Sequence, residues 1–84
     1  MAIKATWIDF TFIRDTGKTK VYEVMSKQSG STLGYVKWFG SWRKYAFFPE
    51  HKTVFEEDCL IAIANFCVTE TVMQRKKNVA NKKR

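Results

Sequence analysis

The residues with the clearest capacity to bind a ligand lie between Lys37 and Phe48, in the segment KWFGSWRKYAFF. Six aromatic side chains alternate there with the cations Lys37, Arg43 and Lys44. Aromatic rings can stack on bases, at about 1–3 kcal/mol for each base, while cations bind the phosphates of a single strand. The same residues could instead form the core of a β-hairpin. The segment therefore favours two interpretations, a nucleic-acid-binding surface and a structural hairpin.

A second group of cations lies at the C-terminal end of the chain. The net charge is +7, but residues 75–84 carry six cations and no acidic residue, so the preceding 74 residues carry only +1. These cations are Arg75, Lys76, Lys77, Lys82, Lys83 and Arg84. Phosphates or anionic lipids are candidate partners for such a run. Stabilisation of the end of a helix by its positive charges is the alternative.

Residue types suited to catalysis or metal binding are sparse. The one histidine, His51, follows Pro49 in a predicted loop, and Cys59 and Cys67 are expected on the core face of a helix. Catalysis at neutral pH usually needs a tuned acid, base or nucleophile in a cleft, and a metal site needs three or four clustered ligands. We therefore expect no enzyme, no cofactor and no metal site.

The sequence also bears on the compartment. It contains neither a secretion signal at its N-terminal end nor 18 consecutive apolar residues. Cys59 and Cys67 are eight residues apart in one predicted helix, about 12 Å along its axis, which is too far for a disulfide. Free thiols suit a reducing compartment. We expect a cytoplasmic protein with no membrane span.

Four strands and one helix are predicted to position these residues. Strands are expected at residues 5–14, 19–26, 33–39 and 42–48. If Gly17 adopts a left-handed conformation in the first turn, Tyr22 and Val24 share a face with Phe12 and Phe10. Pro49 lacks the N–H that a longer fourth strand would need, so that strand is expected to end there.

The helix is predicted to begin at a capping box formed by Thr53 and Glu56 and to end at Lys77. One face should cover the sheet, and it carries Phe55, Cys59, Leu60, Ile63, Phe66 and Cys67. Glu70 falls within this face, so either the helix has passed the sheet edge there or the pattern fails. A second apolar row, formed by Ile61, Val68 and Val72, lies on the opposite side. This row fits a helix–helix dimer, a partner's groove, or scattered apolar surface.

The sheet face away from the helix is also predicted to be apolar. Phe10, Phe12, Tyr22, Trp38, Tyr45 and Phe47 are expected beneath the helix, and the outer face carries Trp7, Val21, Met25, Tyr35, Phe39 and Phe48. A change of one residue in the pairing of strands three and four would exchange their faces. An uncovered apolar surface of this size is unusual in a monomer, so a second copy, a partner or bases should cover it.

The stretch from Leu33 to Cys67 resembles a pattern found in small uncharacterised phage and prophage proteins. Its shared features are Leu-Gly, an aromatic segment of the form LGxxKWxGxWRxYxFFP, and Thr-Val-Phe at the start of a helix. The resemblance implies a phage-related accessory protein in a bacterial cytoplasm. It implies no activity and no site residues, and the basic run after Arg75 lies outside it.

We therefore expect a single α+β domain at residues 1–77 and a flexible basic tail at residues 78–84. The domain should be a four-stranded antiparallel meander with one C-terminal helix packed on one face. The leading functional hypothesis is nucleic-acid binding by the tail together with Lys37, Trp42, Arg43 and Lys44, with outer-face aromatic rings stacking on bases. The alternatives are a module that binds a host protein, such as an inhibitor, through the outer aromatic face or the helix row, and a homodimer.

Overall fold

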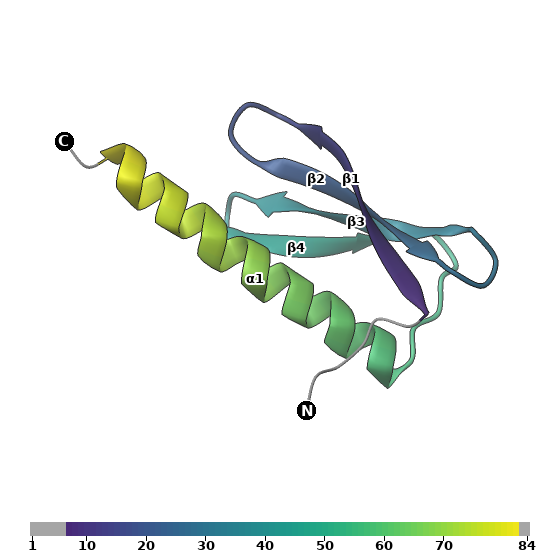
Figure 1. Cartoon of the computed structure of the whole chain (residues 1–84). Helices are drawn as coiled ribbons and strands as arrows, with labels where there is room; N and C mark the ends of the chain where they lie inside the picture. The colour runs from purple at the N-terminus through teal and green to yellow at the C-terminus, as the bar shows by residue number, and fades with distance from the viewer. Residues whose placement is uncertain (1–6, 83–84) are drawn as a thin grey trace.

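The computed structural model describes residues 7–82 of the chain, and side chains as far as Lys77. Four strands form one antiparallel sheet in the order β1-β2-β3-β4, and a single helix packs on one face, as predicted (Figure 1). The elements are β1 (Ile8–Asp15), β2 (Lys20–Ser26), β3 (Thr32–Phe39), β4 (Lys44–Pro49) and α1 (Glu57–Lys82). The α+β fold expected from the sequence is therefore confirmed.

The register of β1 and β2 matches the expectation from the turn between them. Phe10 pairs with Val24 and Phe12 with Tyr22, so these residues share a face. Gly17 has a φ of 102°, in the left-handed region that glycine adopts without steric cost, and its N–H donates to the Asp15 carboxylate at 2.8 Å. Local turn chemistry thus fixes the pairing of the first hairpin.

The pairing of β3 with β4 settles which aromatic residues share a face. Val36 pairs with Phe47 and Trp38 with Tyr45, on the face that the helix covers. Tyr35 pairs with Phe48, on the outer face with Glu23 of β2. The predicted faces of both strands are therefore correct.

The bounds of β4 differ from the prediction. The strand begins at Lys44, two residues later than expected, and Pro49 belongs to it and pairs with Gly34. Trp42 lies instead in the turn, where its N–H donates to the Phe39 carbonyl at 3.1 Å. Because β4 is an edge strand, the missing N–H of Pro49 costs no ladder hydrogen bond on its open side.

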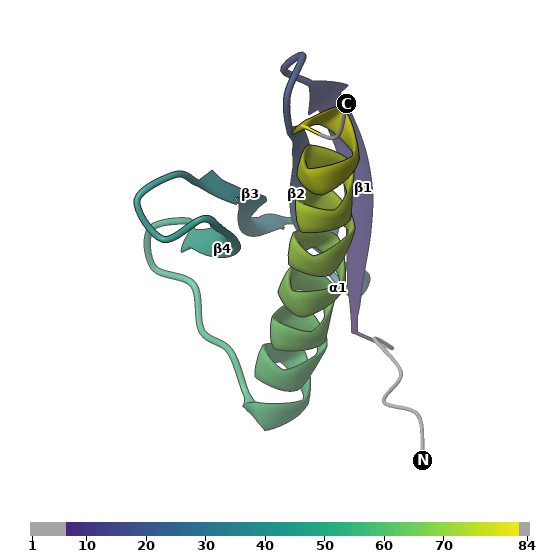
Figure 2. The same ribbon diagram turned by 90° about the vertical axis from the view of Figure 1, so that its left-hand side faces the viewer.

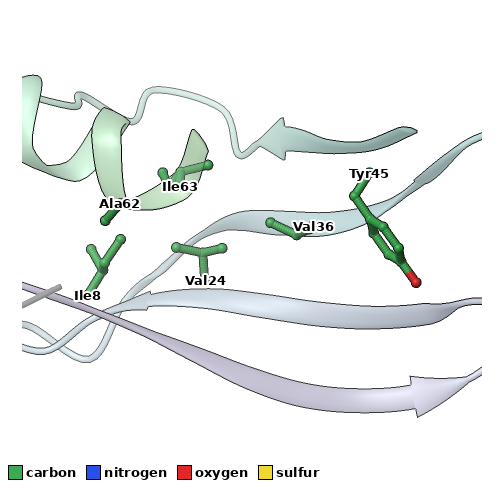
Figure 3. Close-up of a cluster of buried hydrophobic side chains, with 6 residues drawn as sticks. All are labelled: Ile8, Val24, Val36, Tyr45, Ala62 and Ile63. Atoms are coloured by element: carbon green, nitrogen blue, oxygen red, sulfur yellow. The ribbon is translucent and has the colours of Figure 1, made fainter. Parts of the chain in front are cut away.

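The core lies between the helix and the inner face of the sheet. It is formed by Ile8, Val24, Val36, Tyr45, Ala62 and Ile63 (Figure 3). Val24 and Val36 are fully buried, and the rings of Phe10 and Phe66 stack at 4.1 Å between centroids. A covering helix and the central strands thus bury the apolar face that period-2 alternation predicts.

Two details of the predicted packing are wrong. Leu60 was expected in the core but is 50% exposed, while Ala62 is buried. Phe12 was expected beneath the helix but is 53% exposed on the edge strand β1, where it packs edge-on against Tyr22. Helical and strand periodicity give the direction of a side chain, but burial also depends on how far the covering element extends.

The predicted capping box is also wrong, because α1 begins at Glu57. The Thr53 hydroxyl donates to the Glu50 carbonyl and not to the helix. Glu56 caps the helix instead: its carboxylate accepts the Asp58 N–H, and its carbonyl accepts the Leu60 N–H at 3.0 Å. A carboxylate on the residue before the first turn satisfies an otherwise unpaired N–H and interacts favourably with the helix dipole.

Candidate functional site

Two turns and the C-terminal half of α1 meet at one end of the sheet (Figure 1). In an antiparallel meander the β1–β2 turn and the β3–β4 turn lie at the same end. Gln74 donates from Nε2 to the Lys18 carbonyl of the first turn at 3.0 Å. Arg75 donates from Nε and Nη2 to the Arg43 carbonyl of the second turn, at 3.3 and 2.9 Å. The helix is therefore attached to both turns by hydrogen bonds.

Two further hydrogen bonds between side chains of α1 and the sheet hold the helix in place. The Tyr45 N–H donates to the Thr71 hydroxyl at 2.9 Å, and the Tyr22 hydroxyl donates to the Glu70 carboxylate at 3.0 Å. Burial, assisted by the hydrogen bond to the Glu70 carboxylate, raises the pKa of Tyr22 to about 12. Burial likewise raises the pKa of Tyr45, whose hydroxyl accepts the Lys20 N–H. The helix thus continues along the sheet past Glu70, with polar contacts in place of apolar ones.

The β3–β4 turn, to which Arg75 is bonded, also exposes an aromatic ring. Trp42 is 66% exposed and packs edge-on against Phe39, with ring centroids 4.6 Å apart. Arg43 has a φ of 55°, a left-handed conformation that costs a non-glycine residue roughly 1–2 kcal/mol. The two hydrogen bonds from Arg75 to the Arg43 carbonyl help to offset that cost. The turn is held in one conformation by a residue from the helix.

The structure therefore brings together part of the predicted nucleic-acid site. Trp42, Arg43 and Lys44 lie next to Arg75, and Lys76 and Lys77 follow on the exposed end of α1. We call the group formed by Trp42, Arg43, Lys44, Arg75, Lys76 and Lys77 the basic end. Backbone helix continues to Lys82, while the side chain of Lys82 and the whole of Lys83 and Arg84 lie outside the described residues.

Lys37 is not part of the basic end. Its Nζ lies 4.6 Å from the centroid of the Phe48 ring, on the outer face of the sheet. Phe39 packs edge-on against Phe48 at 6.2 Å on the same face, and Tyr35 pairs with Phe48. These outer rings are half-buried, and the single helix of the described chain lies on the other face of the sheet (Figure 1). The outer face is thus continuous with Trp42 through Phe39.

The remaining predicted binding residues lie elsewhere. Trp7 is 50% exposed, and its carbonyl accepts the Lys27 N–H at the end of the sheet away from the basic end. Ile61, Val68 and Val72 are exposed on the side of α1 that faces away from the sheet. The structure therefore separates the predicted partner-binding residues into the outer sheet face, Trp7 and the helix row.

Sequence reasoning missed the polar contacts that position the basic end. Thr71 and Gln74 are both buried, yet neither belongs to the predicted core-facing stripe of the helix. The single signal in the sequence was Glu70, a charged residue at a core-facing angle. A polar residue in a core stripe indicates that the opposing surface offers hydrogen bonds, as Tyr22 does here.

Within residues 7–82, no three or more His, Cys, Asp and Glu side chains gather into a group that could hold a metal ion. No helix in that part of the chain is long and apolar enough to cross a membrane.

Comparison with known proteins places the chain among phage proteins. No family model matches it, and no solved structure matches it. An uncharacterised 9.3 kDa protein of Acholeplasma phage L2 is 34% identical over 79 residues, which span 90% of this chain and 99% of the phage protein. The match bears out the expected relation to phage proteins and leaves the aromatic motif untested. The chain therefore belongs to the same protein family as this 9.3 kDa protein of Acholeplasma phage L2.

Proposed function

We propose that the protein is a non-enzymatic phage accessory protein that binds nucleic acid at its basic end, in the cytoplasm of the host. The observation that carries this proposal is the pair of hydrogen bonds from Arg75 to the Arg43 carbonyl. They join the cations of the helix to the turn that exposes the Trp42 ring. The cations of the β3–β4 turn and β4, Arg43 and Lys44, thus lie beside those of α1 and can contact the same strand of nucleic acid.

The arrangement suits a single strand. An indole ring that is 66% exposed offers a flat surface on which a base can stack, for about 1–3 kcal/mol. Lys44, Lys76 and Lys77 are exposed cations around it, able to neutralise phosphates. If about four phosphates are contacted, the logarithm of the association constant should fall with the logarithm of the salt concentration with a slope of about −3.

The test is a salt series of oligonucleotide binding with two variants of equal net charge. Arg43→Gln/Lys44→Gln removes two cations of the basic end, and Lys27→Gln/Lys52→Gln removes two cations outside it. Lys27 makes a solvent-exposed ion pair with Asp9, of 3.7 Å, which contributes little to stability. The binding of a fluorescent single-stranded 12-mer is measured by anisotropy for each variant.

We expect the first variant to bind at least about tenfold more weakly and its salt slope to shrink by about 1.4, or 0.7 for each lost phosphate contact. The second variant should bind nearly as the unaltered chain does. Equal weakening by both variants would mean that net charge alone attracts the strand. Absence of binding at low salt would refute the proposal.

The alternative function is binding of a host protein through the outer sheet face, favoured by the partly exposed rings of Tyr35, Phe39 and Phe48. Such an interface would depend on desolvated aromatic side chains, so its affinity would change little with salt. Retention of a host protein at high salt, together with its loss on Phe48→Ala, would favour this function over nucleic-acid binding.

A further inference from the structure

The side of α1 that faces away from the sheet carries an apolar row with a charge at each end. Ile61, Val68 and Val72 are 42%, 61% and 47% exposed, and Ala64 between them is exposed as well. At about 100° for each residue, these four lie within an arc of about 80° that also contains Glu57 and Arg75. We call this set of six residues the helix seam: Glu57, Ile61, Ala64, Val68, Val72 and Arg75.

Every residue of the helix seam is exposed, and Arg75 at its end also reaches the β3–β4 turn. Figure 2 shows α1 in front of the sheet, with no other described element over its outer side. From Glu57 to Arg75 the seam extends for about 27 Å at 1.5 Å per residue. Residues spaced by three and four along one face are the arrangement through which two helices pack. The seam thus has the length and spacing of a helix–helix contact.

The positions of the seam residues are nearly symmetric about residue 66. Ala64 and Val68 lie two residues on either side of it, and Glu57 and Arg75 lie nine residues on either side. An antiparallel second helix centred on this position would therefore place Ala64 opposite the partner's Val68. Ile61 lies five residues before this centre and Val72 six residues after it, so Ile61 and the partner's Val72 would be offset by one residue, about 1.5 Å along the axis. Such a contact is related by a two-fold axis, as most homodimer contacts are.

Charge identifies the occupant of the seam as a second copy in antiparallel orientation. Each copy carries Glu56, Glu57 and Asp58 at the start of α1, and Arg75, Lys76 and Lys77 at the other end of the described side chains of α1. Antiparallel pairing sets Glu57 opposite the partner's Arg75 and brings Asp58 to the same edge as the partner's Lys76, at both ends of the contact. Parallel pairing would instead set like charges against one another, which is unfavourable.

We propose that two copies of the chain pair antiparallel through the helix seam. Contact along Ile61, Ala64, Val68 and Val72 removes apolar surface from water, and the acidic and basic ends fix the direction of pairing. Arg75 remains bonded to the Arg43 carbonyl through Nε and Nη2, and its Nη1 takes no part in those bonds. The proposal does not rest on nucleic-acid binding, and it places the two basic ends at opposite ends of the dimer.

The first test measures mass against concentration by sedimentation equilibrium. The unaltered chain should move from its monomer mass of 9.9 kDa towards twice that value as its concentration rises. Val68→Glu places a charge at the centre of the seam and should weaken dimerisation at least about tenfold. Val54→Glu is the matched control, because Val54 is 90% exposed outside the seam, and it should not change dimerisation.

The second test exchanges charges along one edge of the seam. Asp58→Lys and Lys76→Asp should each weaken the dimer, and the double variant should restore it, because opposite charges then face each other again. Both substitutions oppose the helix dipole, so an effect through helix stability alone would make the double variant weaker than either single variant. Thermal unfolding is recorded for every variant.

Three results would overturn the proposal. The first is a chain that remains monomeric up to about 1 mM, where even the weakest specific pairing becomes visible. The second is equal weakening by Val68→Glu and Val54→Glu. The third is a double charge variant that dimerises no better than the single variants.

Discussion

The replacement of Gly34 by alanine should destabilise the fold through one close approach between β3 and β4. Gly34 is buried and pairs with both Val24 and Pro49. A Cβ at this position would lie 2.5 Å from the Phe48 carbonyl oxygen and 2.7 Å from Cε1 of the Phe47 ring. The carbonyl belongs to the backbone of a paired strand, so it cannot move without disturbing the ladder.

The Phe47 ring is constrained as well. It packs edge-on against Phe55, with centroids 5.1 Å apart, in the segment that leads into α1. Overpacking of this kind costs about 1–3 kcal/mol, while the change from glycine to alanine returns about 0.4–1 kcal/mol by restricting the unfolded chain. We expect a net loss of about 1–2 kcal/mol in the free energy of unfolding.

That loss is large for a chain of 84 residues, whose total stability should be about 4–13 kcal/mol. The melting temperature should fall by about 4–16 °C. Urea and thermal unfolding, followed by circular dichroism, measure both quantities. Gly40→Ala is the control, because a Cβ added at Gly40 would have nothing within 4 Å. This variant should change stability by less than about 0.5 kcal/mol. Equal stability of the two variants would refute the argument from close packing.

Three further predictions concern the contacts beneath the helix. Thr71→Val removes the acceptor of the Tyr45 N–H and should cost about 1–3 kcal/mol in urea unfolding. Because the folded pKa of Tyr22 is raised to about 12, its contribution to stability is complete below pH 10 and should be lost as the pH rises towards 12. The Tyr22→Phe variant should lack this part of the alkaline decline, measured as the urea midpoint against pH. Burial raises the pKa of Cys67, so its alkylation at pH 8 should be at least about tenfold slower in the folded chain than in urea, in a variant whose other cysteine is serine.

The sequence was sufficient to predict those features that depend on near neighbours in the chain. Alternation of apolar residues predicts each strand because one face of the sheet is covered, and Gly17 sets the register of the first hairpin. The same alternation could not show that Phe12 is exposed, because it gives the face of a residue and not its distance from the covering helix. The exposure of Leu60 on α1 has the same origin.

The candidate site was less predictable because its parts are far apart in the chain. Arg43 and Arg75 are 32 residues apart, and each was recognised as a cation of a separate cluster. Their contact follows from the meander, which brings the first and third turns to one end of the sheet, and from the direction of α1. The hydrogen bond between Gln74 and the Lys18 carbonyl depends on the same arrangement. Spacing in the sequence carries no information about such contacts.

The two halves of α1 are held to the sheet by different forces. The stability of the domain therefore depends on other residues than the geometry of the basic end does. Ala62, Ile63 and Phe66 in the first half are buried against the apolar inner face, so their truncation should lower the stability of the whole domain. The second half is attached by hydrogen bonds, and the last of these, from Arg75, is solvent-exposed. Its loss should release the β3–β4 turn while leaving the core intact, because exposed hydrogen bonds contribute little to global stability. The position of Trp42 relative to the helix cations therefore depends on residues whose replacement the fold should tolerate.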